Sequence, residues 1–210
     1  MTTSTRQLIE GFRRFRARHF DENEVQFRAL VEQGQSPKVL VVACCDSRVD
    51  PALVLDCAPG DLFVVRNVAN LVPPVESHGK YHGTSAALEF GVRTLGVQHI
   101  IVLGHARCGG IRALMNRDAE HENSFIDGWM ELAEAARSEV LRELADASDS
   151  ERERACERRA ILGSLRNLKT FPWIRERVEA GELTLHGWYF DIEHGELLRY
   201  DETANRFESL

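Results

Sequence analysis

Two short apolar runs in this chain each lead into residues that can bind a metal ion. The first, residues 39–42, is followed by Cys44, and the second, residues 100–103, is followed by His105 and Cys108. Two thiolates and one imidazole are typical zinc ligands, and three protein ligands leave one tetrahedral position open, as in catalytic rather than structural sites. These residue types therefore predict zinc-dependent chemistry at the open position.

The three donors are far apart in sequence, so the fold must bring them together. In open sheets of parallel strands, binding residues collect beyond the carboxyl ends of the strands. If the strands before Cys44 and His105 are neighbours, both side chains reach one crevice, and Cys108 follows at the entrance to the next helix. A His-x-x-Cys motif alone is more often accidental than functional. The adjacent thiol of Cys45 also leaves open which cysteine is the ligand.

The wider pattern predicts the sheet that this arrangement needs. Short continuous apolar strands separated by helical segments are typical of a parallel sheet covered on both faces. Two later strand patterns, joined at His194-Gly195, predict a hairpin that adds an antiparallel edge strand. We therefore expect an α/β fold with a central, mainly parallel β-sheet flanked by helices. The predicted strands are residues 38–43, 61–66, 99–103, 183–190 and 196–200.

Helical patterns surround these strands. The first runs from Arg6 to about Val31, with an apolar stripe opposite arginines. Asp50-Pro51 has the composition of a helix start, and residues 84–95 have helical spacing. Residues 127–168 are helix-rich, but the charged stretch 148–154 predicts a loop or a helix break.

Length and composition indicate one globular domain. At 210 residues and 43% hydrophobic content the chain can bury one sizeable core. We expect a single domain over 1–210, with an N-terminal helical arm in 1–33 and the zinc-binding core in 34–210. The net charge of -7 argues against nucleic-acid or anionic membrane partners, and no apolar run approaches the roughly 20 residues that span a bilayer.

The cysteines bear on the compartment. Five cysteines, an odd number without a regular framework, fit reduced thiols and metal ligands better than disulfides. The first residues also lack the apolar core of a signal peptide. The expected location is the cytoplasm.

The motifs around the predicted ligands closely resemble those of the β-class carbonic anhydrases. That family carries Cys-x-Asp-x-Arg and His-x-x-Cys, and the likeness covers nearly the whole chain from Gly34 to Tyr200. The resemblance implies a zinc-dependent lyase that reversibly hydrates carbon dioxide to bicarbonate and a proton. The matching segments are 34–37, 44–48, 60–70, 105–108 and 187–191.

Within this resemblance, motif register resolves the choice between the two adjacent cysteines. Cys44 takes the ligand position and Cys45 the variable one. Together with His105 and Cys108, Cys44 would hold the Zn²⁺ cofactor.

Asp46 and Arg48 fall into the catalytic dyad of the family. Two thiolates cancel the charge of zinc, which then polarises water less than it would in a three-histidine site. A carboxylate beside the bound water can accept its remaining hydrogen and orient a lone pair toward carbon dioxide, a role that suits Asp46. Arg48 can hold this carboxylate ionised and away from the metal. Without the flanking motifs, the pair would be interpreted as a surface salt bridge.

The resemblance also implies a substrate pocket completed by a second chain. Gln35 would help to hold carbon dioxide or bicarbonate across a dimer interface, while Phe63 and Val68 form apolar walls and Gly109 completes the substrate-binding set. Apolar walls suit carbon dioxide because it has no hydrogen-bond donor. The protein is expected to be a homodimer or a dimer of dimers, that is, a tetramer.

Two further positions bear on the behaviour of the site. One group in the family carries a tryptophan three residues before the first cysteine, as part of a noncatalytic bicarbonate site that favours an inactive form. Val41 stands there, which together with Gln35 indicates the plant-type, constitutively open group. Phe90 stands where plant-type members often carry tyrosine, so a role for that hydroxyl is not expected.

Two other functions fit parts of the pattern. A carbon disulfide or carbonyl sulfide hydrolase would use the same zinc site and differ in tunnel and assembly. A structural zinc protein or a thiol redox protein would usually bring a fourth Cys or His, or a Cys-x-x-Cys pair. Carbon dioxide hydration is the leading interpretation, with His78, His82 and His99 as candidate proton shuttles.

Overall fold

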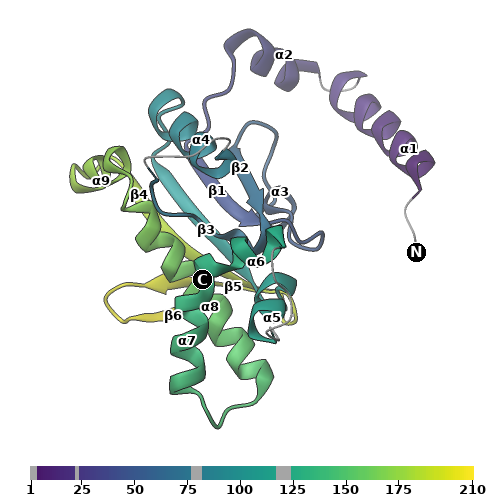
Figure 1. Cartoon of the computed structure of the whole chain (residues 1–210). Coiled ribbons are helices and arrows are strands. Elements are labelled where there is room, and N and C mark those ends of the chain that lie inside the picture. Colours follow the sequence, from purple (N-terminus) through teal and green to yellow (C-terminus); the bar gives the residue numbers. More distant parts are fainter. Residues whose placement is uncertain (1–3, 22–23, 77–81, 117–123) are drawn as a thin grey trace. The chain divides into compact units, whose positions relative to one another are not determined.

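The chain divides into two compact units, residues 1–36 and 37–210 (Figure 1). The structure, a computed structural model, describes residues 4–21, 24–76, 82–116 and 124–210. The division lies close to the predicted boundary between arm and core. That both units form one domain stays a prediction.

The N-terminal unit is helical but is not the single α-helix that the sequence predicts. Its elements are α1 (Thr5–Arg16), the π-helical turn η1 (Ala17–Asp21) and α2 (Glu24–Gln33). A capping box between Ser4 and Gln7 satisfies backbone N–H groups at the start of α1. Aromatic rings then pack around the π-helical turn, where the ring centroids of Phe20 and Phe27 are 4.6 Å apart.

The core unit is built on a six-stranded sheet in the order β2-β1-β3-β4-β5-β6. The first four strands are parallel, and β5 and β6 continue the sheet antiparallel. The α/β prediction is confirmed. The strands are β1 (Val39–Cys44), β2 (Leu62–Asn67), β3 (His99–His105), β4 (Thr184–Asp191), β5 (Glu196–Asp201) and β6 (Arg206–Ser209).

The antiparallel edge has two strands, whereas the sequence predicts one. β6 has only four residues, and only one of them, Phe207, is a large apolar residue, so no alternation marks it as a strand. Phe207 packs on Tyr189 and Tyr200, with ring centroids 6.2 Å and 5.4 Å away. Tertiary packing, rather than local pattern, therefore stabilises this strand.

Helices cover the sheet and close its carboxyl end (Figure 1). α4, α8 and α9 bury apolar side chains against Leu40, Val42 and Ile100 of the sheet. α5, α6, α7 and the first half of α8 surround a second apolar cluster that contains Cys44 and Cys108. The helices are α3 (Pro51–Val54), η2 (Val68–Asn70), α4 (Gly83–Glu89), η3 (Phe90–Thr94), α5 (Gly109–Met115), α6 (Phe125–Met130), η4 (Glu131–Ala133), α7 (Glu134–Glu143), α8 (Asp149–Leu168) and α9 (Pro172–Glu179).

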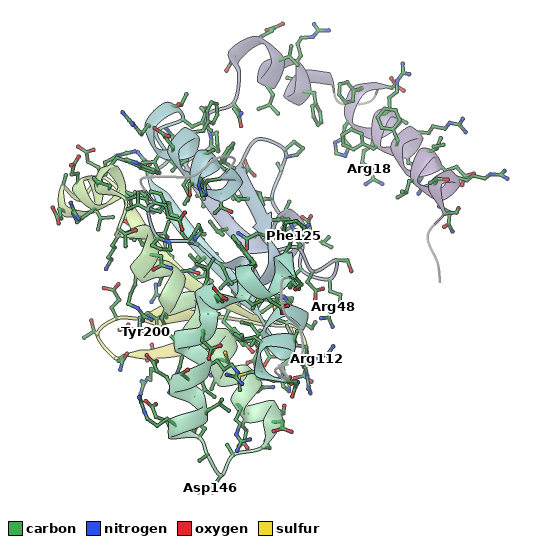
Figure 2. All side chains as sticks on the ribbon, in the orientation of Figure 1. Arg18, Arg48, Arg112, Phe125, Asp146 and Tyr200 are labelled. Atoms are coloured by element: carbon green, nitrogen blue, oxygen red, sulfur yellow. The ribbon has the colours of Figure 1, made fainter. Side chains whose placement is uncertain are left out.

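The predicted break over 148–154 is wrong in position. α8 begins at Asp149, so all but the first of these residues are helical, and the turn lies before them. Figure 2 shows Asp146 at the tip of this turn between α7 and α8. Ser148 and Glu151 form a capping box, and acidic residues in the first turn favour the helix dipole. The charges therefore start a helix instead of ending one.

The strands that precede the predicted ligands are direct neighbours. β1 pairs with β2 on one side and with β3 on the other, both in parallel, and Ala43 lies opposite Leu103. The next strand in the chain after β1, β2, is added on one side of β1, and the following strand, β3, is added on the other side. This reversal of strand order is the place where ligands bind in open α/β sheets, beyond the carboxyl ends of the strands. No helix in the described part of the chain is long and apolar enough to cross a membrane.

Candidate metal centre

Cys44, His105 and Cys108 converge at the switch in strand order. Cys44 ends β1, His105 ends β3, and Cys108 is the N-cap of α5. Their candidate ligand atoms all lie within 4.8 Å of one another, and all three residues are buried. The two sulfurs are 4.0 Å apart. The fold therefore assembles the three donors that the sequence predicts.

The imidazole of His105 is oriented for a metal. Its Nδ1 lies 2.8 Å from the carbonyl oxygen of Ala106, a contact in which Nδ1–H donates. Its buried Nε2 has no hydrogen-bond partner among the described residues. A buried nitrogen without a partner is costly, and a ligand histidine usually donates its other N–H to a carbonyl or carboxylate. The site therefore fits Zn²⁺, which would accept the free lone pair of Nε2.

A single S–H···S hydrogen bond joins the two cysteines, and either sulfur can be its donor. The hydrogen bond with Cys108 lowers the pKa of Cys44 to about 4, and backbone N–H groups of Asp46 and Ala69 act in the same direction. The same bond between the sulfurs, burial and the Cys44 thiolate raise the pKa of Cys108 above its ordinary value. A cation that binds both sulfurs must displace this proton, so metal affinity falls as pH falls.

Asp46 and Arg48 form a bidentate ion pair next to the donor cluster. Arg48 Nε donates to Asp46 Oδ1 at 2.9 Å, and Arg48 Nη2 donates to Oδ2 at 2.7 Å. The backbone N–H of Arg48 also donates to Oδ1, at 3.0 Å. These bonds hold the pKa of Asp46 far below its ordinary range. Arg48 Nη2 also reaches the carbonyl oxygen of Arg107 at 3.0 Å, so the dyad is attached to the His105–Cys108 loop.

Arg66 organises the loop after β1, although no motif in the sequence marks it as part of the site. It donates to the carbonyl oxygens of Cys44 and Asp46 at 2.9 Å and 2.7 Å. Its third contact is an ion pair with Asp50 at 2.8 Å. The available signal was a charged residue within an otherwise apolar strand pattern, where burial requires partners.

Val68 and Gly109 lie near the cluster. Val68 follows β2 and, with Cys45, Trp129 and His82, lines a groove of about 610 Å³. Its carbonyl oxygen accepts a hydrogen bond from Trp129 Nε1 at 2.8 Å. Gly109 directly follows Cys108, and a Cβ there would meet no atom within 4 Å. Both positions are consistent with the substrate-binding roles that the sequence predicts, which stay predictions.

Phe63 is not part of this cluster within one chain, and Gln35 belongs to the N-terminal unit. Phe63 lies four residues before the end of β2, roughly 13 Å along the strand at 3.3 Å per residue. Its ring packs against Phe90, with centroids 5.9 Å apart. Gln35 is exposed in the N-terminal unit. The roles of both residues stay predictions.

The candidate proton shuttles are dispersed. His82 lines the groove with Cys45 and lies 3.9 Å from Glu76. His99 lies at the start of β3, and its Nδ1 is 3.3 Å from Nε2 of His186 on β4. His78 lies outside the described residues.

Known proteins resemble this chain in sequence and in fold. The carbonic anhydrase family model matches residues 39–197. The chain is 42% identical over 186 residues to Arabidopsis thaliana "Beta carbonic anhydrase 5, chloroplastic", covering 88% of this chain and 61% of that one. It is 41% identical over 203 residues to "Beta carbonic anhydrase 6, mitochondrial" of the same plant, covering 95% and 69%. The chain is thus shorter than both relatives and spans less than two thirds of the first.

Two solved structures resemble the chain closely. The β-carbonic anhydrase CcaA superimposes with a TM-score of 0.92 at 36% identity, over 98% of this chain and 91% of that one. A structure of tetrameric β-carbonic anhydrases from Sordaria macrospora has a TM-score of 0.81 at 30% identity, over 91% and 94%. The likeness therefore extends over the whole core and its site.

The comparisons correct the expected cytoplasmic location. The relatives at 42% and 41% identity are named chloroplastic and mitochondrial. Reduced cysteines and a metal thiolate site report reducing surroundings, and they do not distinguish one such compartment from another. The inference from cysteine count to the cytoplasm is therefore wrong.

Proposed function

Because the chain belongs to the β-class carbonic anhydrases, we propose that it catalyses the zinc-dependent, reversible hydration of carbon dioxide to bicarbonate and a proton. Enzymes of this activity are lyases. The observation that carries the proposal is the buried group of Cys44, His105 and Cys108, whose donor atoms lie within 4.8 Å of one another. The neighbouring pair of Asp46 and Arg48 supports it.

Cys44, His105 and Cys108 would hold the zinc ion. When bound, zinc lowers the pKa of water toward neutrality and so supplies the nucleophile. Asp46 accepts three hydrogen bonds from Arg48, whereas a carboxylate offers about four acceptor positions. The remaining position can accept a hydrogen from the attacking water, which turns a lone pair of that water toward carbon dioxide.

Arg48 supplies orientation and charge. Its fork holds both oxygens of Asp46, and the same side chain binds the carbonyl oxygen of Arg107. The carboxylate thus stays ionised and stays directed by the loop that carries Cys108. Val68 offers carbon dioxide an apolar wall. Bicarbonate is an anion, and it is released because water solvates it better than an apolar wall does.

A metal and activity measurement tests the proposed function. The purified protein should contain about one zinc per chain and should accelerate carbon dioxide hydration in a stopped-flow indicator assay. A chelator that removes the zinc should abolish the rate, and added zinc should restore it. Hydrolysis of carbonyl sulfide without carbon dioxide hydration would favour the hydrolase alternative. Bound zinc with neither activity would favour a non-catalytic zinc protein.

We also propose that the chain belongs to the plant-type group of the family, in which the active site is constitutively open. Val41, in place of tryptophan, is fully buried beside Ala43 and Ile101 in the sheet. Asp46 is held by Arg48 and is not among the donor atoms that lie within 4.8 Å of one another. Both observations support a carboxylate that is free for water rather than bound to zinc.

The proposed assembly is a homodimer or a dimer of dimers. The Sordaria macrospora relatives are tetrameric. Leu8 and Phe12, one helical turn apart on α1, are exposed by 63% and 62%. Neighbouring exposed apolar side chains are typical of a surface that binds another protein chain. If Phe63 forms a substrate wall, its place on β2 makes it a wall of another subunit's site.

Removal of the residues before Phe20 should weaken the dimer and lower activity, because the apolar face of α1 would no longer be buried between subunits. Light scattering and the hydration assay at one protein concentration measure both effects. Phe12→Ser should reproduce the dissociation, whereas Arg13→Ser on the same helix is the matched control. A full-length protein that is monomeric and active at assay concentration would contradict the assembly.

A further inference from the structure

A buried carboxylate contacts the backbone of one predicted zinc ligand. Glu157 lies in the middle of α8 and is only 4% exposed. Its Oε1 accepts a hydrogen bond from the backbone N–H of Cys108 at 2.9 Å. Its Oε2 accepts one from the hydroxyl of Tyr189 at 2.7 Å. A carboxylate is rarely buried without a specific task, because its desolvation is costly.

The N–H that Glu157 binds belongs to a peptide group that is held at both ends. The peptide between Arg107 and Cys108 directs its carbonyl oxygen to Arg48 Nη2 at 3.0 Å and its N–H to Glu157 at 2.9 Å. A peptide group is planar, with these two atoms on opposite sides. Two bonds in opposite directions therefore fix the rotation of the plane and, with it, the direction in which Cys108 leaves the loop.

This loop needs such support. Arg107 has a φ of 61°, in the left-handed region that is unfavourable for a non-glycine residue. The turn brings Cys108 back toward His105 within three residues. Without an acceptor on α8, the buried N–H of Cys108 would lack a partner, and the peptide could rotate to relieve the backbone.

We propose that Glu157, anchored by Tyr189, is a positioning residue that directs Cys108 toward the metal and, through the shared peptide group, links Cys108 to Arg48. The inference rests on the proposed zinc site. Metal sites depend on such outer contacts, whose loss typically costs 10- to 100-fold in metal affinity or activity. The role requires a hydrogen-bond acceptor and not a negative charge.

Two substitutions separate the acceptor from the charge. Glu157→Gln keeps an oxygen for the Cys108 N–H, and its amide can donate to the Tyr189 hydroxyl oxygen, which has free lone pairs. Glu157→Leu keeps apolar volume but no acceptor. Zinc transfer to a chromophoric chelator should be about 10- to 100-fold faster than in the wild type for Glu157→Leu, and close to the wild type for Glu157→Gln. In cobalt-substituted protein, the thiolate-to-metal absorption should shift only in Glu157→Leu.

Ser164→Ala is the matched control on the same helix. Ser164 is 2% exposed, and its hydroxyl bonds the Val72 N–H at 3.1 Å and the Asn70 carbonyl at 3.3 Å. Its removal should lower thermal stability without faster zinc transfer. If Ser164→Ala releases zinc as fast as Glu157→Leu, the role of Glu157 is only structural and the proposal fails.

Three other outcomes would also overturn the proposal. Wild-type zinc retention in Glu157→Leu would contradict this inference alone, whereas a wild-type protein without zinc would contradict the proposed function as well. If Glu157→Leu does not fold, Tyr189→Phe decides, because it frees one oxygen of Glu157 and leaves the carboxylate in place. Faster zinc transfer and a shifted cobalt spectrum in Tyr189→Phe are then expected, and wild-type values would defeat the proposal.

Discussion

Cys44→Ser should purify almost free of zinc and without hydration activity, whereas Cys45→Ser should keep both. Cys44 supplies one of two sulfurs that lie 4.0 Å apart, close to His105 Nε2, which has no hydrogen-bond partner among the described residues. A serine hydroxyl is a much poorer zinc ligand than a thiolate, and it leaves only two good protein ligands. Metal analysis of the two variants, purified in parallel, measures the effect.

The two cysteines are well matched, since they are neighbours of identical chemistry. Cys44 ends β1 and is 5% exposed, whereas Cys45 directly follows the strand, is exposed and lines the groove. A Cys45→Ser protein without zinc, next to a zinc-loaded Cys44→Ser protein, would reverse the ligand assignment and remove the basis for the role of Asp46.

The same comparison shows what residue types alone can predict. Donor types at the ends of two apolar strands predicted that one of the two adjacent cysteines would lie near His105 and Cys108 if the strands are neighbours, because parallel strands align their carboxyl ends. The choice of Cys44 over Cys45 needed the family motif, since both thiols are equally suitable as ligands. Residue types report donors, and the three-dimensional register decides which of them converge.

Residues that act through another residue's backbone were not predicted, although the charge of Arg66 within an apolar strand pattern was a signal for buried partners. Arg66 binds a carbonyl oxygen 20 residues before it, and Glu157 binds an N–H 49 residues before it. Neither contact leaves a periodic or motif signal in the sequence. In 148–154 the local signal was present but was misinterpreted, because a capped helix start and a solvated loop have similar charged compositions.

Asp46→Asn should lower the rate constant of carbon dioxide hydration by about 10²- to 10⁴-fold, the usual contribution of a positioned acid–base group, while zinc content stays near the wild-type level. The amide keeps the size of the carboxylate but cannot remain an acceptor on both sides. It therefore loses either a contact to Arg48 or the position offered to water. The stopped-flow assay and metal analysis of the same preparation measure the two quantities.

The pH dependence distinguishes this role from that of a general base that titrates near neutrality. Arg48 depresses the pKa of Asp46 far below its usual range. The stabilisation from their pair is therefore complete above the ordinary carboxyl pKa and is lost only as pH falls toward the depressed value. Titration of Asp46 should then contribute nothing to the rate profile near neutrality, and Asp46→Asn should lower the whole profile without moving its midpoint.

Asp61→Asn is the control for this experiment. Asp61 is an exposed carboxylate that accepts a hydrogen bond from the Ala58 N–H at 2.8 Å in the turn before β2. Loss of its charge should leave the hydration rate unchanged. If Asp46→Asn also keeps the wild-type rate, the pair with Arg48 is only a salt bridge, worth about 0–1 kcal/mol at a surface. If Asp46→Asn instead loses zinc, the carboxylate supports the metal site, and the acceptor role proposed for it is wrong.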